Sequence, residues 1–154
     1  MSFLSKSKGK PFHEAISHCR WKTILCNEVL TKPELQDLKQ YANQTFDEIF
    51  LFVHSLCSPV KGIGMLTIYD ITAEICRVND ILIDKVYIIG GGPERAVQLL
   101  HIVPKKRNIK RITLSYVEIA DVIRAFKDIP LANPANGDEI ETFLCKWQKK
   151  IKSI

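Results

Sequence analysis

The chain has 154 residues and a formal net charge of +5, with 46% hydrophobic and 25% charged residues. These proportions are typical of one ordinary globular domain and exclude an intrinsically disordered chain. No apolar run approaches the roughly 20 residues of a membrane-spanning helix and no secretory signal is present, so we expect a cytoplasmic protein without a membrane partner.

The N-terminal residues 1–12 contain three lysines and no apolar stretch, and we expect a mobile basic arm there. The remaining residues, 13–154, are expected to form a single helical domain. Five scattered cysteines without a CxxC pair argue against a disulfide framework and a zinc site, and favour reduced, buried thiols.

Two amphipathic helices are predicted between residues 45 and 78. The first apolar stripe has the spacing i, i+3, i+4, i+7 and i+11 and ends at Pro59. It consists of Phe46, Ile49, Phe50, Val53 and Cys57. A matching stripe on the following helix consists of Ile68, Ile71, Ile75 and Val78. The segment Val60–Thr67 is therefore predicted to be the turn that joins two helices.

Two short β-prone runs, Lys85–Ile89 and Arg111–Leu114, follow this pair of helices. They either pair as one short two-stranded ribbon or form no strand. The expected fold class is therefore mainly α, a compact multi-helix domain in which such a ribbon is the one β element.

Three further helices are predicted in the second half of the chain. Pro93, after three glycines, suits the first turn of a helix that continues to His101. Ser115 and Glu118 have the spacing of a capping box for a helix that reaches Phe126. The apolar stripe of the last helix consists of Ile140, Phe143, Leu144, Trp147 and Ile151.

Positive charge is concentrated in two places. The first cluster has no acidic residue among its seven positions and consists of Lys105, Lys106, Arg107, Lys110 and Arg111. The second, near the C-terminus, consists of Lys146, Lys149, Lys150 and Lys152. Uneven positive charge favours a polyanionic partner, because cations that neutralise phosphates release condensed counterions.

The turn Val60–Thr67 contains the residues with the clearest chemistry. Gly62 and Gly64 let the backbone turn tightly and leave the N–H groups at the start of the second helix unshielded. Together with the positive end of the helix dipole, these donors suit a phosphate oxygen. Ile63 is expected to point inward as an apolar anchor. A contact of this kind positions a protein on nucleic acid without reading sequence.

This segment resembles the helix-hairpin-helix motif of DNA-repair and DNA-processing proteins. In that family a glycine–hydrophobic–glycine turn grips the phosphates of one strand, often with a bound monovalent cation. The resemblance implies that Gly62 and Gly64 are the two turn glycines, Ile63 the anchor and Thr67 the small or polar residue that begins the second helix. Lys61 stands where proline is common and keeps positive charge near a phosphate.

Three other positions depart from that motif. Met65 and Leu66 replace polar or basic residues that often contact DNA, and Ile68 stands where alanine is usual at the helix crossing. These departures change side chains around the turn and leave its two glycines in place.

A wider resemblance extends from Gly62 to Cys145. The order of its short motifs, among them Ile68–Asp70, Asp84–Tyr87 and Gly90–Pro93, is similar to a family of small uncharacterised bacterial proteins. The resemblance implies a bacterial cytosolic protein and supplies no catalytic residue.

The leading hypothesis is non-enzymatic, sequence-tolerant binding of nucleic acid, with DNA expected over RNA. It requires no metal and no cofactor beyond the monovalent cation that the resemblance suggests. The residues expected to bind are Lys61, Gly62, Ile63, Gly64, Thr67, Lys105, Lys106, Arg107, Lys110 and Arg111.

Two alternatives stay open. In the first, the chain is a protein-interaction or assembly domain that uses Met65 and Leu66 as contacts. In the second, it is a DNA glycosylase with Asp84 as its catalytic carboxylate, 20 residues after Gly64 (84 − 64 = 20). Against the second, Leu66 occupies the position of the lysine nucleophile in bifunctional glycosylases.

Overall fold

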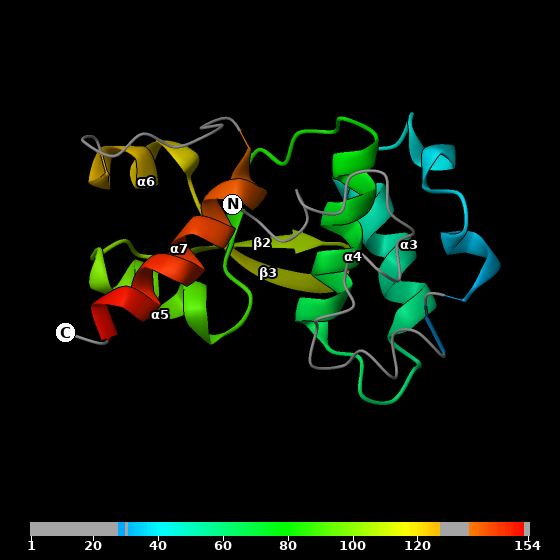
Figure 1. The fold of residues 1–154 in the computed structure, drawn as a ribbon, viewed down its shortest axis with the longest axis horizontal. Coiled ribbons are helices and arrows are strands. Elements are labelled where there is room, and N and C mark those ends of the chain that lie inside the picture. Colours follow the sequence, from blue (N-terminus) through cyan, green and yellow to red (C-terminus); the bar gives the residue numbers. More distant parts are fainter. Residues whose placement is uncertain (1–27, 30, 127–135, 153–154) are drawn as a thin grey trace. The chain divides into compact units, whose positions relative to one another are not determined.

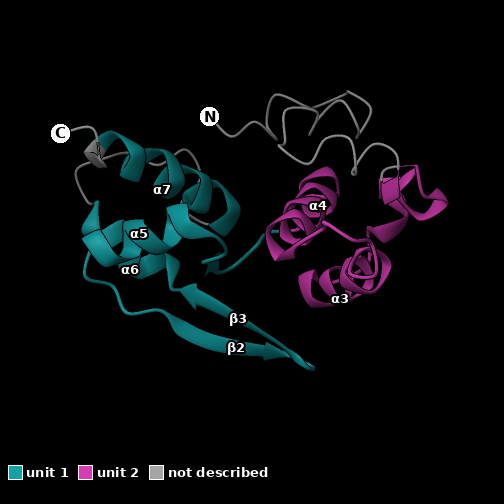
Figure 2. Cartoon of the chain, turned by 90° about the horizontal axis from the view of Figure 1, so that it is seen from below, with its two compact units in different colours: residues 1, 82–154 teal, residues 2–81 magenta. Residues whose placement is uncertain are grey.

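The computed structural model describes residues 28–29, 31–126 and 136–152, with side chains up to residue 150. The chain divides into two compact units, distinguished by colour in Figure 2. We call residues up to Ile81 the hairpin unit and residues from Leu82 the sheet unit. The N-terminal arm expected over residues 1–12 lies outside the described residues, and the single domain expected over 13–154 stays a prediction.

The hairpin unit is helical throughout its described elements. Two short 3₁₀ helices, η3 (Pro33–Leu35) and η4 (Leu38–Tyr41), precede α3 (Phe46–Cys57) and α4 (Met65–Val78). Figure 1 shows α3 and α4 side by side, and they are in contact along their lengths. The two helices predicted between residues 45 and 78 are therefore confirmed.

A capping box fixes the start of α3. The Thr45 hydroxyl accepts a hydrogen bond from the Glu48 N–H at 3.2 Å, and the Glu48 carboxylate accepts one from the Thr45 N–H at 3.4 Å. These bonds satisfy two donors that a helix start otherwise leaves unpaired. The whole predicted stripe of α3, from Phe46 to Cys57, is buried.

The sheet unit contains three strands and three helices. Its strands are β1 (Val86–Tyr87), β2 (Lys105–Ile109) and β3 (Ile112–Val117). Its helices are α5 (Gly91–Leu99), α6 (Ile119–Ala125) and α7 (Gly137–Lys152). The strand order is β1–β3–β2 and both pairings are antiparallel. Helix α7 packs on α5 and also contacts β1 (Figure 1).

The mainly helical class is confirmed, but the β structure is larger than the expected ribbon. Both β-prone runs lie in strands, β1 and β3, but β1 pairs with Tyr116 and Val117, beyond the second predicted run. That run pairs instead with the basic segment that begins at Lys105, which is an unexpected third strand. The first four residues of β2 are charged or polar, and only Ile109 is apolar and buried. The segment therefore lacks the alternating apolar pattern that signals a strand. An edge strand tolerates such charged residues because they prevent pairing with other chains.

The capping box expected at Ser115 and Glu118 is wrong. Ser115 lies within β3, opposite Lys106, and its carbonyl accepts a hydrogen bond from the Ile88 N–H at 2.8 Å. Helix α6 begins later, at Ile119, after an N-cap Glu118 whose side chain makes no capping hydrogen bond. Pairing within the sheet therefore overrides the local helix signal.

An apolar core holds the helices of the sheet unit against one face of the sheet. It includes Val86 and Val117 from the strands, Val97 from α5 and Leu144 from α7. At its rim the Phe126 ring makes edge-on contacts with Phe143 and Trp147, at centroid distances of 5.1 and 4.9 Å. In the described part of the chain, no helix has the length and apolar character needed to cross a membrane.

Candidate nucleic-acid interface

The turn between α3 and α4 is built from backbone hydrogen bonds. The Val60 N–H donates to the Cys57 carbonyl at 3.0 Å, and the Ile63 N–H donates to the Val60 carbonyl at 3.2 Å. Gly62 has a φ of 94°, in the left-handed region that side chains with a Cβ disfavour. The turn therefore requires glycine at this position.

Ile63 is the buried residue of the segment Lys61–Gly64. Ile63 is only 9% exposed, whereas Lys61, Gly62 and Gly64 are exposed. This is the arrangement expected for an inward anchor between two surface glycines. The positive charge of Lys61 thus lies on the same short loop as the open backbone of both glycines.

The backbone conformation at position 64 does not require glycine. It is the N-cap of α4, and its φ of −104° and ψ of −177° are ordinary extended values. A Cβ at this position would meet no atom within 4 Å. Serine, threonine, aspartate or asparagine would fit here and would cap the helix better than glycine or equally well. The fold therefore gives no steric reason for glycine at the start of α4.

Helix α4 begins without a cap and without acidic side chains in its first turn. In the part of the chain that the structure describes, no side chain accepts a hydrogen bond from its first amides, those of Met65, Leu66 and Thr67. Such N–H groups carry the positive end of the helix dipole. They are suited to an anion that approaches from solvent.

Thr67 is buried, whereas a residue that contacts nucleic acid was expected to be exposed. Its side chain is only 4% exposed, within the first turn of α4. Only its amide belongs to the open helix start, so a hydroxyl contact to a ligand is not available. Beside it, Leu66 is 46% exposed.

The basic residues from Lys105 to Arg111 belong to the sheet unit, whereas the turn belongs to the hairpin unit. Four of them are exposed: Lys105, Lys106, Lys110 and Arg111. Arg107 is half-buried and donates a hydrogen bond to the Tyr87 hydroxyl at 3.0 Å. The Lys105 ammonium lies 3.7 Å from the Glu118 carboxylate. Sequence analysis missed both of these contacts, because nothing local signals pairing between distant residues.

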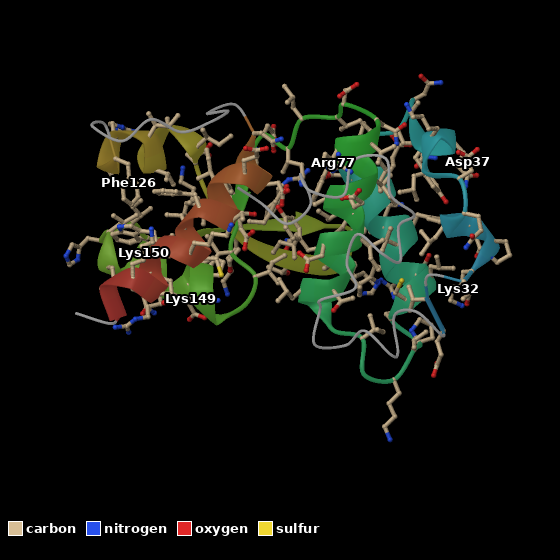
Figure 3. The ribbon with its side chains drawn as sticks, in the orientation of Figure 1. Lys32, Asp37, Arg77, Phe126, Lys149 and Lys150 are labelled. Atoms are coloured by element: carbon tan, nitrogen blue, oxygen red, sulfur yellow. The ribbon has the colours of Figure 1, made fainter. Side chains whose placement is uncertain are left out.

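The second basic cluster lies on α7. Lys146, Lys149 and Lys150 are exposed, and Figure 3 labels the latter two near the end of the helix. Cations in the last turns of a helix interact favourably with its dipole, which gives these lysines a structural reason to be there.

Asp84 does not have the surroundings of a catalytic carboxylate. Its side chain is 83% exposed, just before β1, and its nearest charged partner is the Lys85 ammonium at 3.7 Å. An enzyme that flips a base must enclose it in a pocket beside the reacting group. We therefore assign no catalytic role to Asp84.

The described thiols are also poor candidates for catalysis. Cys57 and Cys76 are buried, and Cys145 is half-buried. Burial raises the pKa of Cys57 to about 11, so the reactive thiolate is scarce at neutral pH. Among residues 28–29, 31–126 and 136–152 no three histidine, cysteine or acidic side chains gather to hold a metal ion.

No protein-family model, curated protein or solved structure matches this chain.

Proposed function

We propose that this chain binds nucleic acid, DNA above all, through the turn between α3 and α4, and that it catalyses no reaction there. In this proposal the two helices and their turn act as a helix-hairpin-helix. The open amide N–H groups at the start of α4 donate hydrogen bonds to a phosphate oxygen, and Lys61 adds positive charge beside them.

The observation that carries the proposal is the uncapped N-terminus at Gly64. A capping side chain would fit there, as the free space around a Cβ shows, yet the position leaves the amides open. No acidic residue occurs between Glu48 and Asp70, so no carboxylate from this stretch repels an anion. Because this contact is made to phosphate, the binding contributed by the turn is sequence-tolerant and steeply dependent on salt.

Replacing Gly64 by aspartate tests the proposal. The new carboxylate caps α4 and places a negative charge where the phosphate binds, so the fold is kept while the ligand is excluded. We expect a loss of affinity of about tenfold to a hundredfold, the equivalent of one or two charge-assisted hydrogen bonds. Fluorescence anisotropy with labelled duplex and single-stranded DNA measures the affinity, and thermal melting measures the stability.

Asn43→Asp is the matched control for that substitution. Asn43 is exposed in the same unit, outside the turn, and the substitution makes the same change in charge. Its effect on affinity should be small. Equal affinities for the parent, Gly64→Asp and Asn43→Asp would show that the turn makes no contact with DNA.

Leu66 favours a second candidate function, a surface that docks another protein. It is 46% exposed next to a half-buried Met65, and exposed apolar groups at a turn are typical of protein interfaces. The two candidates predict opposite results for Leu66→Lys. An added cation should strengthen DNA binding severalfold at low salt and increase its salt dependence by about one counterion. Unchanged or weaker DNA binding by this variant would favour the protein-docking surface.

A further inference from the structure

The ribbon formed by β2 and β3 has one polar face. The register places Lys106 opposite Ser115 and Asn108 opposite Thr113. Side chains of directly paired residues leave the same face of a sheet, and residues two apart along a strand share that face. All four side chains therefore form one row, in which Lys106, Asn108 and Thr113 are exposed.

A hydrogen bond across the strands orients this polar row. The Thr113 hydroxyl donates to the Asn108 side-chain oxygen at 2.7 Å. The amide NH₂ of Asn108 has no partner in the described part of the chain. It therefore keeps two donors for a ligand, beside the ammonium of Lys106.

The opposite face of the ribbon carries buried apolar side chains. Ile109 and Leu114 on that face are buried, and Arg107 beside them is bonded to the Tyr87 hydroxyl of β1. The ribbon projects from the helices of its own unit (Figure 2). The Arg107–Tyr87 hydrogen bond ties β2 to the sheet of its own unit.

The tip of the ribbon adds two exposed cations. Lys110 and Arg111 form the turn between the strands, and Lys110 has a φ of 54°. No acidic residue occurs between Glu94 and Glu118, so no carboxylate within this stretch offsets the charge. This positive end is complementary to the phosphates that line a groove of nucleic acid.

We infer that the β2–β3 ribbon enters the major groove of duplex DNA, with Lys106, Asn108 and Thr113 at the base edges and Lys110 and Arg111 at the phosphates. A groove about 12 Å wide admits a two-stranded ribbon, and lysine, asparagine and threonine are side chains that bond base edges. The inference rests on the proposed function because both take DNA as the ligand. It adds a preference for certain sequences, which a phosphate contact alone does not provide.

The full chain with Lys110→Gln and Arg111→Gln tests the phosphate contacts. We expect affinity for duplex DNA to fall about tenfold or more, with a salt dependence weaker by about two counterions. Affinity for duplex RNA should change little, because the major groove of A-form RNA is too deep and narrow for side chains to read. The matched control removes two exposed charges elsewhere, with Lys39→Gln and Arg95→Gln.

Asn108→Ala tests the base contacts. A selection of tight-binding duplexes from a random pool by the parent chain supplies the probe, and a scrambled duplex supplies the reference. The parent's preference for the selected over the scrambled duplex should fall about fivefold to a hundredfold in the variant. Failure of the selection to enrich any sequence, or an unchanged preference, would overturn the base-reading role.

The outcomes separate this inference from the proposed function. If the tip variant binds duplex DNA like the parent, or loses affinity for duplex RNA equally, the ribbon does not enter the groove. Gly64→Asp should instead weaken the binding of every DNA form, including single strands. If Gly64→Asp binds normally and the ribbon variants do not, the turn is the wrong site and the ribbon inference stands. If the parent binds no duplex DNA even at low salt, both proposals fail.

Discussion

Replacing Gly137 by alanine is expected to lower the free energy of unfolding by about 3 kcal/mol or more, at the upper end of overpacking effects. Gly137 is buried at the first position of α7. A Cβ there would lie 1.9 Å from the Lys85 carbonyl oxygen and 2.5 Å from its carbon. Both atoms are backbone just before β1, so they cannot rotate away as the end of a side chain can.

A hydrogen bond at the same position increases the expected effect. The Gly137 N–H donates to the Ile83 carbonyl at 2.6 Å, and moving α7 away to admit a methyl group would break this bond. Gly91→Ala is the control, because a Cβ at the start of α5 meets no atom within 4 Å. Urea unfolding followed by circular dichroism measures both variants. Equal midpoints would show that the close approach of α7 to residues 83–85 is absent in solution.

Replacing Phe50 by alanine should have a similarly large effect in the hairpin unit, about 3–5 kcal/mol. Phe50 is fully buried in α3, and its ring stacks on that of Phe46 at a centroid distance of 5.9 Å. Truncation removes the buried ring and leaves a cavity that rigid neighbours fill only in part.

Phe52→Ala is the matched control for Phe50. Phe52 is half-buried on the same helix and its ring lies 5.6 Å from that of Tyr41, so less buried surface is lost. Urea unfolding should therefore show a clearly smaller loss. If Phe52→Ala costs as much as Phe50→Ala, the division of α3 into a buried and a half-exposed face is wrong.

The long helices could be predicted because helical periodicity is a local property of the sequence. The stripe from Phe46 to Cys57 repeats every three to four residues, and each member is buried in α3. Strand β2 could not be predicted this way, because four of its five residues are not buried and its place depends on pairing with β3. Ser115 shows the same limit, because its local spacing favours a helix cap but the residue pairs with Lys106 in the sheet.

The sequence predicted which residues form the turn of the candidate site, but not the role of each residue. The exposed glycines and the inward Ile63 follow from the pattern of the turn. The sequence could not show that only Gly62 needs glycine for its backbone, or that Thr67 would be buried, since both depend on the geometry around the start of α4. It also could not show that Arg107 would bond Tyr87, 20 residues away in the chain.

At the uncapped start of α4, a substitution that raises thermal stability would block the proposed phosphate contact. A serine at position 64 would close an amide with its own hydroxyl and add up to a few tenths of a kcal/mol. Mutants enriched for survival at high temperature would thus tend to acquire a hydroxyl where a phosphate oxygen is proposed to bind. Consensus-style stabilisation of this protein should therefore leave position 64 untouched.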